Sequence, residues 1–283
     1  MAKVYEALRR AEEERKRKVA GDVAPLPAVD WDPTPQTAPK PSKKLGSLLK
    51  RTPAVGRGGP SSNAAAEANK RRISLLEPDS FIAEQFRMLR SRIDSMAAEA
   101  PIKTIAITSA NAGEGKSNVS INLAVVTAMS VDRRVLLIDC DMRRPTICRS
   151  LGLDAQNGLA EVLMGRCNLD DAIVKVEGTS LDALGVRLQP QNPSELLGSM
   201  EMQRLLEEAS ERYDRVILDT PATLGLPDSK IVAGLCDAYL MVVRAGDTAR
   251  EDVEAALEVL DRRRAVGVVL NGADMGHERY AYY

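Results

Sequence analysis

The segment at 103–118, KTIAITSANAGEGKSN, limits the possible folds of this chain more than any other part of the sequence. The β-branched residues at 104–108 predict a strand, and a glycine-containing loop then leads into a helix predicted to begin near Lys116. Such a loop turns backbone N–H groups towards an anion, and the positive end of the helix dipole points to the same place. We therefore predict a phosphate-binding loop whose nucleotide contacts are Gly113, Glu114, Gly115, Lys116, Ser117 and Asn118.

The Lys-Ser pair at the start of that helix distinguishes a nucleotide site from an ordinary turn. Lys116 is expected to reach the β- and γ-phosphates, and Ser117 is expected to bind Mg²⁺. The full pattern G-x-x-x-x-G-K-[ST] would have glycine at position 110, where this chain has Ala110. The alternative is a strand-to-helix turn that binds nothing, but such a turn does not need Lys-Ser. The helix is predicted to be amphipathic, with apolar residues Val119, Leu123, Val126 and Ala128.

Beyond this loop, buried-strand and helix patterns alternate along the chain. Strands are predicted at 134–139, 215–219, 238–243 and 266–270, and helices at 203–211 and 252–262. Continuous apolar strands separated by helices are typical of a parallel sheet that is covered on both faces. The predicted fold class is therefore α/β, a P-loop NTPase-like parallel sheet with helices on both faces, preceded by a disordered N-terminal linker.

Three carboxylates follow two of these strands: Asp139 and Asp141 after one, and Asp219 after the other. Ligands collect at the carboxyl ends of parallel strands, so these groups are expected near the phosphate loop. An acid that closes an apolar strand meets water or Mg²⁺ more often than it stays buried without a partner. In phosphoryl transfer, one carboxylate holds the metal and another accepts the proton of the attacking hydroxyl. For Asp139 and Asp141, a helix-capping or turn role is the alternative.

Composition divides the chain into four parts. Residues 1–18 predict a charged helix, either solvated or docked on a partner, because strong helix formers are combined with Glu-to-Lys and Glu-to-Arg pairs. Residues 19–77 are rich in Pro, Gly, Ser and Ala and predict a disordered linker. Residues 78–275 are the predicted P-loop domain. Residues 276–283 are predicted to be a flexible tail that carries the tail tyrosines, Tyr280, Tyr282 and Tyr283.

A helix is predicted after Asp79 or Ser80, either of which can cap it. Its apolar stripe, expected to pack on the domain, is Ile82, Phe86, Leu89, Ile93 and Met96. A charged triplet, Glu84, Arg87 and Arg90, is spaced at three-residue intervals and is expected to project away from that stripe. On spacing alone, this triplet is an ordinary charged surface.

Net charge and composition exclude several functions. The formal net charge is -1, aromatic residues make up 3% of the sequence, and there is one histidine, so nucleic-acid binding and a histidine metal site are not expected. No apolar run approaches the roughly 18 residues of a membrane-spanning helix. The protein is therefore expected to be soluble and cytoplasmic.

Five segments together resemble the bacterial tyrosine kinases, or BY-kinases, which autophosphorylate and regulate exopolysaccharide export. They are GEGKS at 113–117, LLIDCDMRRP at 136–145, PQNPSELL at 190–197, YDRVILDTP at 213–221 and GVVLN at 267–271. The resemblance covers positions from about 78 to 283 and implies an ATP-dependent protein tyrosine kinase that uses Mg²⁺. Ala112 and Ala222 stand where the family often has proline, but neither is a phosphate ligand.

The resemblance also implies a role for each site residue. Lys116, Asp139 and Asp141 would be the catalytic set, with Asp139 as the base for the tyrosine hydroxyl. Asp141 and Asp219 would support Mg²⁺ together with Ser117. The charged triplet matches the family's E-x-x-R-x-x-R helix, which builds a ring of subunits.

The tail resembles the family's C-terminal tyrosine cluster, so the tail tyrosines are the expected phosphoacceptors, labelled in trans. The expected partners are a membrane-embedded activator of a polysaccharide export system, further copies of this chain, and protein substrates that carry tyrosine.

Two other functions fit the same fold. A partitioning or septum-positioning ATPase resembles this chain in the order of strands and loop, but its phosphate loop needs a lysine at the second position, where this chain has Asn111. A non-catalytic ATP-binding adaptor of a polysaccharide export complex would keep Lys116 but would have no use for the tail tyrosines.

Overall fold

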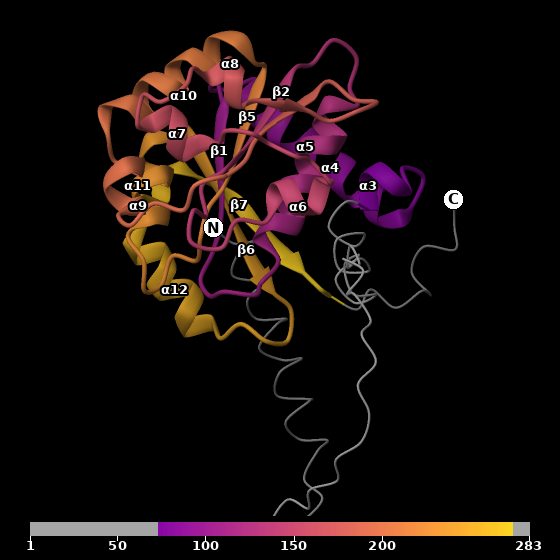
Figure 1. Ribbon diagram of the computed structural model, residues 1–283. Helices are drawn as coiled ribbons and strands as arrows, with labels where there is room; N and C mark the ends of the chain where they lie inside the picture. Colours follow the sequence, from indigo (N-terminus) through magenta and orange to yellow (C-terminus); the bar gives the residue numbers. More distant parts are fainter. Residues whose placement is uncertain (1–72, 274–283) are drawn as a thin grey trace, which may run out of the picture.

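Seven strands form one sheet in the order β3-β4-β2-β5-β1-β6-β7 (Figure 1). The structure is a computed structural model and describes residues 73–273. Neighbouring strands are parallel, except that the edge strand β3 runs antiparallel to β4. The strands are β1 (Thr104–Ser109), β2 (Val135–Asp139), β3 (Val174–Lys175), β4 (Leu181–Leu184), β5 (Arg215–Asp219), β6 (Ala238–Arg244) and β7 (Ala265–Asn271).

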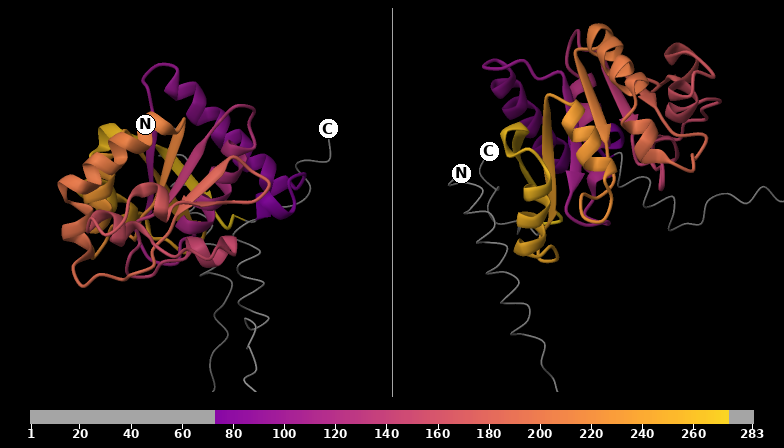
Figure 2. Two further views of the ribbon diagram at one scale, coloured as in Figure 1. Left: turned by 45° about the horizontal axis from the view of Figure 1, so that its top comes forward. Right: turned by 90° about the vertical axis from the view of Figure 1, so that its left-hand side faces the viewer.

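Helices cover both faces of the sheet, which confirms the predicted α/β class (Figure 2). The predicted N-terminal helix at 1–18 and the predicted linker up to residue 72 lie outside the described residues. They are α3 (Ile73–Leu76), α4 (Phe81–Ala97), α5 (Lys116–Ala128), α6 (Ile147–Leu151), α7 (Leu159–Leu163), α8 (Leu169–Ala172), α9 (Pro193–Leu197), α10 (Met200–Arg212), α11 (Asp228–Leu235) and α12 (Arg250–Val259), with a 3-10 turn η1 (Arg262–Arg264). One hydrophobic cluster joins the sheet to α4, α5 and α6, and a second joins its other face to α7, α10, α11 and α12.

The central strands show why continuous apolar runs were the correct signal. Every residue of β1 is buried. Ile105 and Ile107 join the cluster beneath α5, whereas Ala106 joins the cluster on the opposite face, because successive side chains of a strand alternate between faces. All five predicted strands are confirmed, with ends that differ by at most one residue.

Helix α5, which follows the phosphate loop, is buried almost all round rather than amphipathic. The prediction was wrong because α3 and α4 cover the side of α5 that would otherwise face water. The backbone N–H of Ser74 in α3 donates to Oδ1 of Asn122 at 2.9 Å. Helix α3 at residues 73–76 therefore packs on the domain, although these residues were assigned to the linker predicted at 19–77.

Helix α4 begins as predicted, since Ser80 Oγ accepts the Ala83 N–H at 3.2 Å. Its buried face is centred on Ala83 and Ile93. The predicted apolar stripe is correct for Phe86, Leu89 and Ile93 and wrong for Ile82 and Met96, which are 46% and 40% exposed. The small Ala83 takes the place next to the core that the stripe assigned to Ile82.

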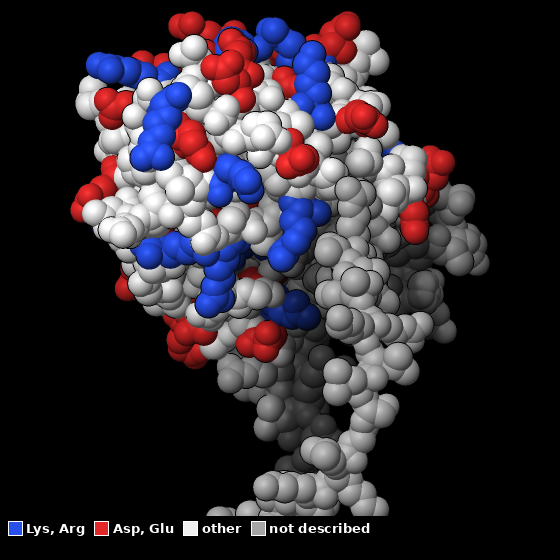
Figure 3. Space-filling view, viewed as in Figure 1, with Lys and Arg blue, Asp and Glu red and all other residues white. Residues whose placement is uncertain are grey.

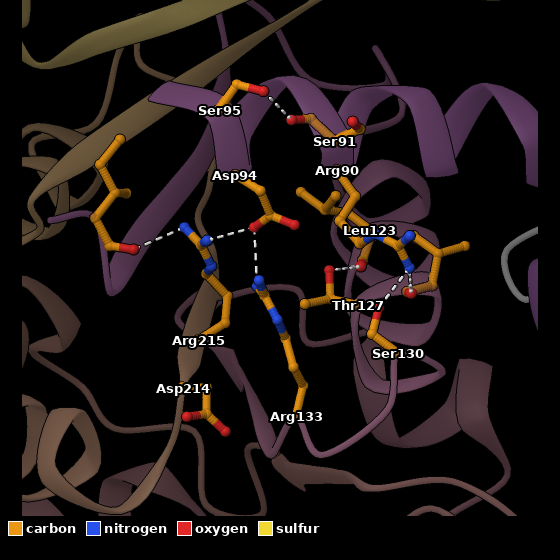
Figure 4. Close-up of polar contacts among 12 residues, drawn as sticks. Arg90, Ser91, Asp94, Ser95, Leu123, Thr127, Ser130, Arg133, Asp214 and Arg215 are labelled. Atoms are coloured by element: carbon orange, nitrogen blue, oxygen red, sulfur yellow. Dashed lines mark hydrogen bonds and ion pairs between the residues drawn. The ribbon is translucent and has the colours of Figure 1, made fainter. Parts of the chain in front are cut away.

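An ion-pair cluster ties α4 to the sheet (Figure 4). Asp94 Oδ1 in α4 accepts from Arg133 at 2.8 Å and from Arg215 at 2.9 Å. The Arg215 side chain is 5% exposed and also donates to the carbonyl oxygen of Ile102 at 2.7 Å. Arg215 opens β5, the strand that ends at Asp219, so the cluster anchors α4 to a strand that leads into the site.

Candidate nucleotide and phosphoryl-transfer site

The phosphate loop connects β1 to α5 at the carboxyl edge of the sheet. Gly113 and Gly115 have φ angles of 87° and 93°, in the left-handed region that favours glycine. Ala110, at the position of the missing glycine, is fully buried and is not among the residues with positive φ, so alanine fits there without strain. Helix α5 begins at Lys116 and directs its N-terminus at this loop.

Side chains from distant segments of the chain form hydrogen bonds that hold the phosphate loop in place. The buried carboxylate of Glu114 accepts the Asn111 N–H at 3.1 Å and the hydroxyl of Thr248. Asn111 Nδ2 in turn donates to Asp252 Oδ2 at 2.8 Å. Asn271 Nδ2 donates to the carbonyl oxygen of Glu114 at 2.9 Å. Both oxygens of the Glu114 carboxylate thus accept hydrogen bonds within the protein. The nucleotide contact predicted for Glu114 would therefore come from its backbone.

Asn118 also has a partner inside the protein, because its side-chain oxygen accepts from Asn122 Nδ2. The nucleotide contacts predicted for the remaining loop residues stay predictions.

Lys116, Ser117 and Asp219 lie together where β5 ends beside the loop. The positive charge of Lys116 and the hydroxyl groups of Ser117 and Ser120 all lower the pKa of the Asp219 carboxylate. Ser120 Oγ donates to Asp219 Oδ1 at 2.9 Å, while Asp219 Oδ2 is buried without a partner in the described residues. The structure therefore brings together Lys116, predicted to bind phosphate, and two of the three predicted Mg²⁺ ligands, Ser117 and Asp219.

The donor atoms around Asp219 suit Mg²⁺ better than a metal whose ligands are all protein side chains. Burial raises the pKa of Asp219 to about 6, although Ser117, Lys116 and Ser120 oppose that shift. Within residues 73–273 no group of three or more His, Cys, Asp or Glu side chains could hold a metal. Mg²⁺ usually takes one or two carboxylates together with water and substrate phosphates. The free oxygen of Asp219 and the Ser117 hydroxyl match that requirement.

Asp139 lies beside Asp219, because β2 and β5 pair in register at these two residues. Its Oδ1 accepts the Asp141 N–H at 3.1 Å, and its Oδ2 accepts the N–H groups of Thr146 and Ile147 at 2.9 and 3.0 Å. Burial, and then the negative charge of Asp219, raise the pKa of Asp139 to about 8. The alternative turn role is therefore confirmed for Asp139, and its role as a base stays a prediction.

Asp141 is half-buried after β2, and its Oδ1 accepts the Arg144 N–H at 3.0 Å. The neighbouring Arg143 donates from Nε to Asp228 Oδ2 at 2.9 Å, and the hydroxyl of Ser194 bonds the other oxygen of Asp228. Asp228 is buried at the start of α11, so this cluster fixes the Asp141 loop against α9 and α11. Sequence reasoning missed Asp228 and Ser194, because only the fold brings them to Arg143.

The charged triplet divides between the surface and the domain. Arg87 bonds Glu84 at 2.8 Å and the carbonyl oxygen of Pro78 at 2.6 Å. Arg90 donates to the carbonyl oxygen of Val126 and to the hydroxyl of Ser130, both at 2.6 Å. The expectation that all three side chains project outward is therefore wrong for Arg90, which lies against the end of α5.

The outer surface near the site carries mixed charge. Figure 3 shows basic side chains over the middle of the viewed face, between α6 and α9 of Figure 1, with acidic side chains mainly around the margin. The tail tyrosines lie outside the described residues. No helix within residues 73–273 has the length and apolar character to cross a membrane.

Residues 102–265 match the family described as AAA domain. Tyrosine-protein kinase YwqD of Bacillus subtilis is 36% identical over 224 residues, which are 78% of this chain and 94% of YwqD. Tyrosine-protein kinase ptk of Acinetobacter johnsonii is 35% identical over 200 residues, which are 71% of this chain but 27% of ptk. The chain therefore spans nearly all of one relative and about a quarter of the other.

A solved structure leads to the same family. The kinase domain of the Escherichia coli tyrosine kinase ETK superposes with a TM-score of 0.69 at 32% identity, covering 75% of this chain and 84% of that domain. The sequence identity above 30% with these kinases and the shared fold agree with one another. The chain belongs to the bacterial tyrosine kinase family.

Proposed function

We propose that this chain is an ATP-dependent protein tyrosine autokinase that phosphorylates its tail tyrosines in trans and regulates exopolysaccharide biosynthesis or export. The observation that carries the proposal is the Oδ2 atom of Asp219, which is buried beside Lys116 and Ser117 with no hydrogen-bond partner among the described residues. A phosphate loop with a free carboxylate oxygen at its base is suited to Mg-ATP. Membership in the kinase family supports tyrosine as the acceptor.

Each residue of the site then has one task. Lys116 neutralises charge on the β- and γ-phosphates, while the loop N–H groups bind phosphate oxygens. Ser117, Asp141 and Asp219 would hold Mg²⁺, which would supply further positive charge at those phosphates. Asp139 takes the proton of the tyrosine hydroxyl in its ionised form, which is a minor fraction near neutral pH because its pKa is raised to about 8.

Labelling in trans follows from a ring of subunits. Glu84 and Arg87 have side chains that are 58% and 31% exposed and are available to a neighbouring copy. A heterologous contact of this kind places each tail beside the next subunit's phosphate loop. Tethering at short range raises the effective tyrosine concentration to roughly millimolar, so weak recognition is sufficient. Each phosphorylated tyrosine then adds a charge of roughly -1.5 to -2, which favours release of the subunits.

The root of the tail also lies near its own loop, because Asn271 Nδ2 is 2.9 Å from the Glu114 carbonyl oxygen. The segment from Asn271 to Tyr280 spans at most about 30 Å when extended. Distance therefore permits labelling in cis as well as in trans, and only the ring contact favours trans. We further propose a membrane-embedded activator as partner, which would hold the kinase at the inner face of the membrane, and no nucleic-acid partner.

A mixing experiment tests this proposal. A Lys116→Met chain with an intact tail is incubated with Mg-ATP and an active chain truncated after residue 275, with and without the cytoplasmic segment of a candidate activator. Phosphotyrosine on the Lys116→Met chain is expected. ATP hydrolysis without phosphotyrosine would favour a partitioning-type ATPase, and ATP binding with neither activity would favour the adaptor.

A further inference from the structure

We propose that Asn271 is a positioning residue for the phosphate loop, setting the affinity of the site for the phosphates of its nucleotide. Asn271 closes the GVVLN segment, to which the proposed function gives no task. The inference rests on the proposed nucleotide-binding role of the loop. It assigns Asn271 an action through Gly115 rather than a direct contact with the reacting atoms.

The register of the sheet brings Asn271 to the loop. Asn271 is the last residue of β7, and β7 runs parallel to β6, so its side chain lies at the same carboxyl edge as the loop after β1. There its Nδ2 donates to the carbonyl oxygen of Glu114 at 2.9 Å. A hydrogen bond between residues so far apart in sequence fixes the loop relative to the edge of the sheet.

Gly115 is shaped to accept this approach. A Cβ atom on Gly115 would lie 2.0 Å from Asn271 Nδ2 and 3.2 Å from Asn271 Cγ, too close for any side chain. Its φ of 93° independently favours glycine. The amide of Asn271 thus fills the space that a side chain at 115 would need, and the two residues fit as a pair.

The hydrogen bond to Glu114 also sets the direction of a phosphate donor. The carbonyl of Glu114 and the N–H of Gly115 belong to one planar trans peptide, so they point in opposite directions. Because Asn271 holds the carbonyl from outside the loop, the Gly115 N–H is turned away from Asn271. Among the residues that the structure describes, the Gly115 N–H donates to no carbonyl oxygen of a loop, turn or helix cap. It is therefore free to donate to a phosphate oxygen.

Asn271→Asp is the sharpest variant, because the carboxylate keeps the shape but cannot donate to the Glu114 carbonyl. Asn157→Asp is the matched control, since Asn157 Nδ2 also donates to a backbone carbonyl, that of Asp171 at 3.3 Å, away from the loop. Affinities of the full chain for Mg-ATP and for Mg-tripolyphosphate are measured by titration calorimetry. Circular dichroism and thermal unfolding check that each variant folds.

We expect Asn271→Asp to weaken both ligands by the same factor, about three- to tenfold, as for loss of one hydrogen bond. Asn157→Asp should bind both like the unaltered chain. In the kinase assay, Asn271→Asp should raise the KM for ATP by a similar factor with little change in kcat, because the residue does not touch the reacting atoms. Asn271→Ala is measured beside it, because the carboxylate of Asn271→Asp also adds a negative charge near the phosphates, and Asn271→Ala must show the same loss.

Three results would overturn the inference. Unchanged affinities would show that the loop holds its own shape. Weaker ATP binding with unchanged tripolyphosphate binding would show that Asn271 contacts the nucleoside instead. An unaltered chain that binds neither ligand would remove the nucleotide site as well. A chain that binds both ligands with the expected losses in Asn271→Asp, but labels no tyrosine, would refute the kinase proposal and leave the role of Asn271 standing.

Discussion

Replacing Asp94 with alanine is expected to lower the free energy of unfolding by about 3 kcal/mol. Asp94 is the carboxylate that faces Arg215, whose side chain is only 5% exposed. Removing one member of a buried ion pair strands the other charge, at a cost of about 3–5 kcal/mol. The lower end applies because Asp94 is 26% exposed and Arg215 keeps its 2.7 Å bond to the Ile102 carbonyl. The pair with Arg133, which is 33% exposed, adds little.

Urea unfolding followed by circular dichroism measures this loss. For a domain of about 200 residues, 3 kcal/mol corresponds to a fall in Tm of about 6–12 °C. The control is Glu208→Ala, which removes an i,i+4 pair with Arg212 whose side chains are 51% and 33% exposed. It should cost only about 0.3–0.5 kcal/mol.

A double variant distinguishes the free-energy cost of an unpaired buried charge from the cost of lost packing. Asp94→Leu combined with Arg215→Met removes both charges and should be more stable than Asp94→Ala. A loss below about 1 kcal/mol in Asp94→Ala, or a double variant no more stable than the single one, would refute the reasoning.

Four further predictions concern the site and the assembly. Lys116→Met should abolish tail labelling on a phosphotyrosine immunoblot while the circular dichroism spectrum stays unchanged. Asp219→Asn should weaken Mg-ATP affinity in calorimetry, whereas Asp139→Asn should mainly lower kcat; equal affinity losses would reassign Asp139 to the metal. Because burial raises the pKa of Asp139 to about 8, the native protein keeps a proton that the unfolded chain releases near pH 4. The free energy of unfolding should therefore fall as pH rises from about 4 to about 8. Asp139→Asn should flatten that slope. Replacing both Glu84 and Arg87 with alanine should lower the mass from light scattering and the rate of tail labelling; loss of the ring with undiminished labelling would show that the two are separate.

The parallel strands could be predicted because their signal is local. Strand β5 reads RVILD and is buried along its whole length. Its apolar run indicates where the strand lies, and its final acid indicates the edge of the sheet at which a ligand binds. The same is true of β2, which ends at Asp139. Short elements such as β3 and α8 contain too few residues to show a pattern of apolar positions and were not predicted.

Errors arose where a helix has more than one neighbour. The burial of α5 depends on α3 and α4, and the orientation of Arg90 depends on the end of α5, so neither is visible in a single helical period. The Asp228 partner of Arg143 and the Asn271 partner of Glu114 are distant in sequence. Only the folded sheet brings these pairs together, which is why sequence located the loops of the site but not the side chains that hold them.

Phosphorylation-site mapping tests the kinase assignment most directly. The full chain and its Lys116→Met variant are incubated with Mg-ATP and the candidate activator segment, and both are analysed by mass spectrometry. Phosphate is expected on the tail tyrosines of the unaltered chain and none on the variant alone. ATP turnover without phosphate on any tyrosine, or equal labelling of the two chains, would contradict it.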